Sequence, residues 1–148
     1  MDVYRICLAK YANILVASGI RGHWNYKGAF VIYTAGSRAL ACLENVVHRS
    51  GEGLTENFRT LVIQIPDKLK IETIPDTALP ANWKDISSYP ACQALANDWY
   101  TKGKTAVLKV PSAIIPEENN YILNTRHPDF CRINIKAVEE FFFDPRIK

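Results

Sequence analysis

The chain has 148 residues, a length that fits one compact domain with an ordinary hydrophobic core. Charged residues make up 22% of the sequence, and the formal net charge of +3 comes without a long run of like charge, which argues against direct nucleic-acid binding and against a membrane surface. The four cysteines form no CxxC pair of the kind that zinc sites use, and no apolar run is long enough to span a bilayer. We therefore expect a cytoplasmic domain without a bound metal.

The first half of the chain predicts two strands and one helix, joined through a polar loop. Residues 2–8 favour extended structure with a single arginine among them, and residues 30–34 form a second short strand of β-branched and aromatic type. Residues 18–28 lie between Ser-Gly and Lys-Gly pairs that are typical of a loop. A Gly-Ser break follows the second strand, after which a helix capped by Ser37 continues to about His48.

This helix carries one apolar face with a carboxylate at its edge. Leu40, Leu43, Val46 and Val47 recur at the three- and four-residue spacing of that face. Glu44 lies one turn beyond Leu40, at the shoulder of the face rather than opposite it. We therefore expect its carboxylate to be partly desolvated.

The second half predicts short strands around one further helix. The elements are strands over residues 61–65, 105–110, 121–123, 132–135 and 140–143, a loop punctuated by Pro75 and Pro80, and a helix that begins at Pro90 and ends at Gly103. Many short strands with few helices indicate an α+β fold, and no linker divides residues 1–148 into separate domains.

Spacing alone leaves the function open, because the sequence contains no GxSxG, Walker or HExxH motif. Five polar residues nevertheless stand among apolar neighbours: Arg5, His23, Tyr33, Glu44 and Ser112. A buried polar group is costly unless it is hydrogen-bonded, so each of them has either a structural partner or a ligand. Taken singly, each also has an ordinary structural interpretation, such as a solvated helix carboxylate or a turn serine.

A series of motifs in fixed order resembles the RES domain family. They are Tyr4-Arg5-Ile6, Gly22-His23-Trp24-Asn25, Val31-Ile32-Tyr33-Thr34, Ser37-Arg38-Ala39-Leu40 with Glu44, Val47-His48, Leu79-Pro80, Asn97-Asp98-Trp99, Val110-Pro111-Ser112-Ala113, Asn120-Tyr121-Ile122-Leu123-Asn124 with His127-Pro128, and Phe143-Asp144-Pro145-Arg146. These motifs span nearly the whole chain, and their shared order is more specific than any one of them.

The resemblance implies a fold similar to ADP-ribosyltransferases and a toxin that degrades NAD⁺. NAD⁺ is then a substrate rather than a permanently bound cofactor, and its nicotinamide–ribose bond is cleaved by hydrolysis or phosphorolysis. The expected protein partner is a helix-turn-helix antitoxin that neutralises the toxin. Two alternatives stay open: transfer of ADP-ribose to a protein, and a catalytically weakened protein that only binds the antitoxin.

The resemblance also implies the site. Glu44 and Ser112 match the glutamate and serine of the family name, and Arg5 matches one of its two arginines. The predicted catalytic residues are Glu44, Tyr33, Ser112 and His23, and the predicted NAD⁺-binding residues are Arg5, Arg21, Trp24, Asn25 and Asn124. A carboxylate suits the positive charge that develops on the ribose, an aromatic ring suits nicotinamide, and an arginine suits the pyrophosphate.

The loop before Trp24 departs from the family pattern, because His23 stands where the family has its second arginine. One interpretation is that a pyrophosphate clamp is lost or passed to Arg21. The other is that His23, Tyr33 and Glu44 act as a trio, in which the imidazole holds a ribose hydroxyl.

Overall fold

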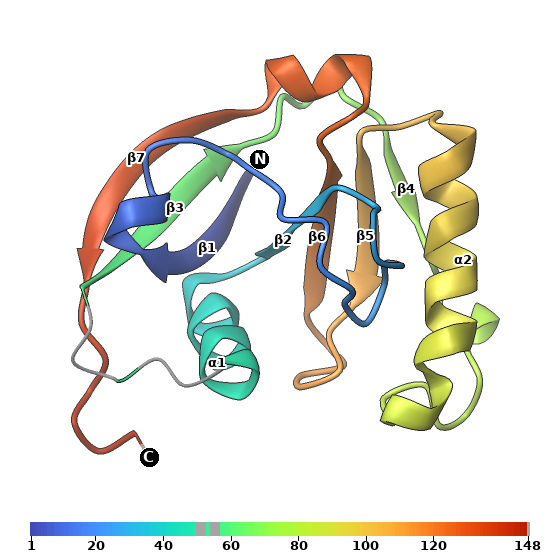
Figure 1. Ribbon diagram of the computed structural model, residues 1–148, viewed down its shortest axis with the longest axis horizontal. Coiled ribbons are helices and arrows are strands. Elements are labelled where there is room, and N and C mark those ends of the chain that lie inside the picture. The colour runs from blue at the N-terminus through green and yellow to red at the C-terminus, as the bar shows by residue number, and fades with distance from the viewer. Residues whose placement is uncertain (50–52, 54–56, 148) are drawn as a thin grey trace.

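The computed structural model describes residues 1–49, 53 and 57–147. In this part of the chain, the strands are β1 (Asp2–Leu8), β2 (Val31–Ala35), β3 (Phe58–Gln64), β4 (Ile71–Thr73), β5 (Val107–Pro111), β6 (Asn119–Asn124) and β7 (Asn134–Phe141), and the α-helices are α1 (Arg38–His48) and α2 (Tyr89–Lys102). The strands form one seven-stranded sheet in the order β4-β5-β6-β2-β1-β3-β7 (Figure 1). The predicted α+β class is confirmed.

The sheet is nearly divided between β1 and β2. β1 pairs with β3 along its whole length, from Asp2 opposite Gln64 to Leu8 opposite Phe58. With β2 it shares a single pair, in which Tyr4 lies opposite Ala35. Beyond that pair the two strands diverge (Figure 1), so the ladder is interrupted between two halves of the sheet.

Each α-helix packs on a different apolar cluster. Leu40 and Ala41 of α1 join Ile6 and Phe58 beside the division, while Trp99 of α2 packs with the apolar side chains of the β5 and β6 half. Figure 1 shows α1 beside β2 and α2 along the β4 end of the sheet. α1 is therefore the helix that packs beside the division between β1 and β2.

Local signals set both helix ends that the sequence predicts most sharply. The Ser37 side chain accepts a hydrogen bond from the Leu40 backbone N–H at 3.1 Å, which caps α1. Gly103 ends α2 in the left-handed conformation at φ +59°, where glycine has no side chain to clash. The bounds of the first strand and the end of α1 agree with the predicted ones.

The end of the chain differs from the prediction. The two strands predicted over residues 132–135 and 140–143 are wrong, because one strand, β7, covers Asn134–Phe141 and pairs with β3 throughout. β7 is an edge strand, and an edge tolerates the charged residues at positions 136, 139 and 140 that conceal a strand pattern. Likewise β4 lies within the stretch predicted as loop, where its parallel pairing with β5 supplies the hydrogen bonds. No described helix is long and apolar enough to cross a bilayer.

Candidate active site

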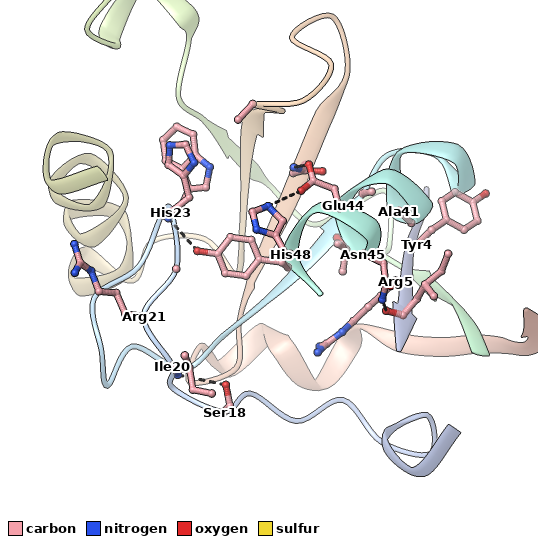
Figure 2. Close-up of a pocket in the computed structure, with 18 residues that line it drawn as sticks. Tyr4, Arg5, Ser18, Ile20, Arg21, His23, Ala41, Glu44, Asn45 and His48 are labelled. Atoms are coloured by element: carbon pink, nitrogen blue, oxygen red, sulfur yellow. Dashed lines mark hydrogen bonds and ion pairs between the residues drawn. The ribbon is translucent and has the colours of Figure 1, made fainter. Parts of the chain in front are cut away.

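A cavity of about 480 Å³ lies where β1 and β2 diverge. It is lined by β1, the loop before β2, β2 itself, α1 and the segment around β6. Of the nine predicted site residues it brings together Arg5, Arg21, His23, Trp24, Tyr33 and Glu44. Figure 2 shows Glu44 and His48 of α1 directed toward the loop that carries His23 and Arg21, with Arg5 reaching in from β1.

The Glu44 carboxylate is the most heavily hydrogen-bonded group in the cavity. Its Oε1 accepts from the Ser112 hydroxyl at 3.1 Å and from the Asn120 amide at 2.6 Å, and its Oε2 lies 3.2 Å from His48 Nε2. The Glu44 side chain is only 22% exposed, as its place at the helix shoulder predicts. Desolvation raises the pKa of Glu44, but the hydrogen bonds from His48, Asn120 and Ser112 outweigh it and hold that pKa below its ordinary value. Glu44 is therefore ionised at neutral pH.

Ser112 lies behind the carboxylate rather than in the cavity wall. It is completely buried, and its oxygen accepts hydrogen bonds from the backbone N–H groups of Ile114 and Ile115 at 3.1 and 3.2 Å. Since these donors occupy the oxygen, the hydroxyl proton is directed to Glu44. Ser112 thus orients the Glu44 carboxylate from behind the cavity wall.

Tyr33 and Asn25 form a second hydrogen-bonded unit. The Tyr33 hydroxyl donates to Asn25 Oδ1 at 2.6 Å and accepts from the Trp24 backbone N–H at 3.0 Å. The Asn25 amide donates to backbone carbonyls of Ile20 and Tyr26, so this side chain ties the loop together and does not line the cavity. Burial raises the pKa of Tyr33, which keeps its hydroxyl protonated.

His23 is held in an aromatic stack. Its ring lies between those of Trp24 and Tyr89, with centroids 5.0 and 4.1 Å away, and its Nε2 lies 3.0 Å from the Trp83 carbonyl. That carbonyl can only accept, so Nε2 carries the proton and Nδ1 is the ring nitrogen left to accept. Desolvation lowers the pKa of His23 and outweighs the carbonyl contact, so the imidazole is neutral at pH 7. A neutral ring cannot replace a guanidinium as a pyrophosphate clamp.

Replacing His23 tests how much this stack stabilises the loop. We expect His23→Ala to lose a stacked ring and one hydrogen bond, about 2 kcal/mol together, which lowers Tm by roughly 4–8 °C. His23→Arg should destabilise as well, because a permanent charge would have to enter the stack. Thermal unfolding of both variants beside the parent gives the answer, and an unchanged Tm for His23→Ala would contradict this account of the loop.

Arg5 and Arg21 supply the cavity's positive charge in different ways. Arg21 is exposed, and its guanidinium lies 3.5 Å from Gln93 Oε1. Arg5 is partly buried in β1, and within residues 1–49, 53 and 57–147 its guanidinium has no hydrogen bond and no ion pair. Desolvation lowers the pKa of Arg5, although the group stays charged. Arg5 is therefore a cation placed in the cavity without a described protein counter-ion.

The structure does not bring Asn124 to the cavity. This residue lies at the end of β6, it is 3% exposed, and its Oδ1 accepts from the Arg126 backbone N–H at 2.9 Å. Conversely, the sequence analysis placed His48 and Asn120 only within family motifs and did not name Asn45, although all three residues line the cavity. The spacing of Glu44 and His48 by four residues was a visible signal for a contact on one helix face. Nothing in the spacing pointed to Asn120.

The described residues thus form one α+β domain in which an ionised carboxylate, Glu44, and a cation, Arg5, line the same cavity. The chain belongs to the RES domain family, whose model matches residues 2–144. It is 38% identical over 128 residues to the Prs ADP-ribosylating toxin of a Sphingobium species, covering 85% of this chain and 80% of that protein. It is 33% identical to Toxin Res of Yersinia enterocolitica over the full length of both chains, and 34% identical to Toxin Res of Pseudomonas putida over 99% of both.

Proposed function

We propose that this chain is a toxin that cleaves NAD⁺ at the bond between nicotinamide and ribose. The observation that carries the proposal is that Arg5, a cation without a described protein partner, and Glu44, an ionised carboxylate, face the same cavity. NAD⁺ carries a pyrophosphate that needs a cation, and a ribose that becomes positively charged as its bond to nicotinamide breaks. The volume of about 480 Å³ lies within the range of small-molecule sites.

In the proposed reaction the bond between ribose C1′ and the nicotinamide nitrogen breaks. Its electron pair stays with the pyridine ring, which leaves as neutral nicotinamide, while C1′ gains oxocarbenium character. The Glu44 carboxylate stabilises this charge and accepts a hydrogen bond from a ribose hydroxyl. The Tyr33 ring offers a face for nicotinamide, whereas Trp24 is 4% exposed and stacks on His23. His23 Nδ1 is available to a second hydroxyl, as the histidine–tyrosine–glutamate trio requires.

The acceptor of the ADP-ribose distinguishes two versions of this function. Water gives free ADP-ribose and phosphate gives ADP-ribose 1″-phosphate, and both amount to NAD⁺ degradation. The second candidate, transfer to a protein, is favoured by the name of the Sphingobium relative, an ADP-ribosylating toxin at 38% identity. We also propose a helix-turn-helix antitoxin as partner, on the family resemblance and on the relatives named Toxin Res.

Labelled NAD⁺ separates these possibilities. We expect the purified protein to release nicotinamide, with the adenosine label in free nucleotide, and phosphate in the buffer to shift that label to the phosphorylated product if the acceptor is phosphate. Label that stays on protein after denaturation would instead identify a protein ADP-ribosyltransferase. The absence of nicotinamide release with water, with phosphate and with cell lysate as the acceptor would contradict NAD⁺ as the substrate.

A further inference from the structure

The Asn120 side chain donates a hydrogen bond to Glu44, while its own carbonyl oxygen has no partner among the described residues. Asn120 is 8% exposed on β6, and its Nδ2 donates to Glu44 Oε1 at 2.6 Å, the shortest contact of that carboxylate. Its Oδ1 is buried and has no hydrogen-bond partner among the described residues. The reversed amide would place Oδ1 against the carboxylate, where two acceptors repel each other. The contact with Glu44 therefore fixes the orientation of this amide, with Nδ2 toward the carboxylate.

The two oxygens of Glu44 stand in different surroundings. Oε1 receives both buried donors, the Asn120 amide and the hydroxyl of Ser112, which is completely buried. Oε2 contacts only His48 among the described residues, and the His48 side chain is 57% exposed. A substrate hydroxyl can displace a half-exposed helix neighbour far more easily than a donor fixed in the sheet.

We propose that Asn120 is a positioning residue, which anchors Glu44 Oε1 from β6 so that Oε2 is the oxygen presented to the substrate. The effect that we expect on kcat rests on the proposed function. The contact between Asn120 and Glu44 itself does not require NAD⁺. His48 occupies Oε2 until the ribose hydroxyl takes its place.

The charged and titratable groups around Glu44 determine how a substitution at Asn120 should change the pKa of this carboxylate. His48 faces it from α1, Tyr33 from β2 and His23 from the loop, and Arg5 and Arg21 line the same cavity. Asn120→Asp is almost isosteric, yet it replaces the donor by a second carboxylate against Oε1. Two carboxylates at this distance cannot both ionise, so one proton is retained between them and the pKa of the Glu44 pair rises.

The test is a titration of the Glu44 carboxyl carbon by NMR without NAD⁺, beside the pH dependence of kcat and KM for NAD⁺ loss. For Asn120→Asp we expect the pKa of the pair to rise by about one unit or more, the acid limb of kcat to move upward equally, and KM to change by less than about threefold. Asn119→Asp is the matched control, since it places the same charge on the neighbouring β6 residue, which does not line the cavity. If the Asp variant does not fold, Asn120→Ala should still raise the Glu44 pKa and lower kcat.

Two results would overturn the proposal. One is a Glu44 titration in folded Asn120→Asp that matches the Asn119→Asp control. The other is a larger loss of kcat in His48→Gln than in Asn120→Ala, since that would make Oε2 the anchored oxygen. Absence of NAD⁺ loss by the parent would contradict the proposed function alone, because the titration still decides whether Asn120 anchors Glu44.

Discussion

Glu44→Gln should abolish NAD⁺ loss while the protein stays folded. The amide retains the shape of the carboxylate, and its oxygen can still accept from Ser112 and Asn120, but the negative charge facing the ribose is lost. The loss of a preorganised electrostatic contact in a transition state costs about 3 kcal/mol, which corresponds to at least about 100-fold in kcat. Nicotinamide release under saturating NAD⁺, with Tm measured on the same sample, gives the comparison.

Glu117→Gln is the matched control for this variant. Glu117 is exposed and does not line the cavity, so the same change of charge there should leave kcat within about twofold of the parent. Turnover by folded Glu44→Gln equal to that of Glu117→Gln would remove Glu44 from the reaction.

The local parts of the fold were predictable because their signals are local. Val3, Tyr4, Ile6 and Cys7 favour extended structure strongly enough to define β1, and Ser37 caps the helix that follows β2. β7 was not predictable in one piece, because its pairing with β3 stabilises a strand whose own sequence is rich in charge. Tertiary pairing, rather than propensity, decides that segment.

The site residues likewise divide into those with a local sequence signal and those placed by tertiary pairing. The periodicity of α1 predicted that Glu44 lies at a desolvated shoulder, and the structure places it there. Asn120 enters the site only because β6 pairs with β2 in a register that sets Asn120 opposite Ala35, and no spacing in the sequence encodes that register. Asn25 and Asn124 were predicted to bind NAD⁺ because they lie within family motifs, yet both side chains bind backbone groups of their own loops, and Asn25 also accepts from Tyr33.

The departure at His23 also gains a physical interpretation. The ring is packed between Trp24 and Tyr89 and hydrogen-bonded through Nε2, so the position serves the loop that carries Arg21 into the cavity wall. Because burial lowers the pKa of His23, the imidazole is neutral at pH 7 and above. Between pH 7 and 8 we therefore attribute the cationic role to the arginines.

Arg5→Met should weaken NAD⁺ binding without weakening the fold. A charged hydrogen bond to the pyrophosphate contributes about 1.5–3 kcal/mol, so KM should rise roughly 10- to 100-fold when the guanidinium is removed. The Tm should stay the same or rise, because the parent desolvates this cation without a described counter-ion and methionine fills a similar volume. KM then rises while Tm does not fall, a combination that loss of structure cannot produce.

Arg59→Met is the matched control for the Arg5 variant. Arg59 lies on β3, outside the cavity lining, and its Nη1 donates to the Phe58 carbonyl at 2.9 Å. Its replacement should leave KM unchanged and lower Tm slightly, since the hydrogen bonds to Asn57 and Phe58 are lost and no unpaired charge is relieved. An unchanged KM in Arg5→Met would leave Arg21 as the cation of the cavity that binds the pyrophosphate. A fall in Tm larger than that of the control would mean that β1 needs the guanidinium for its own packing.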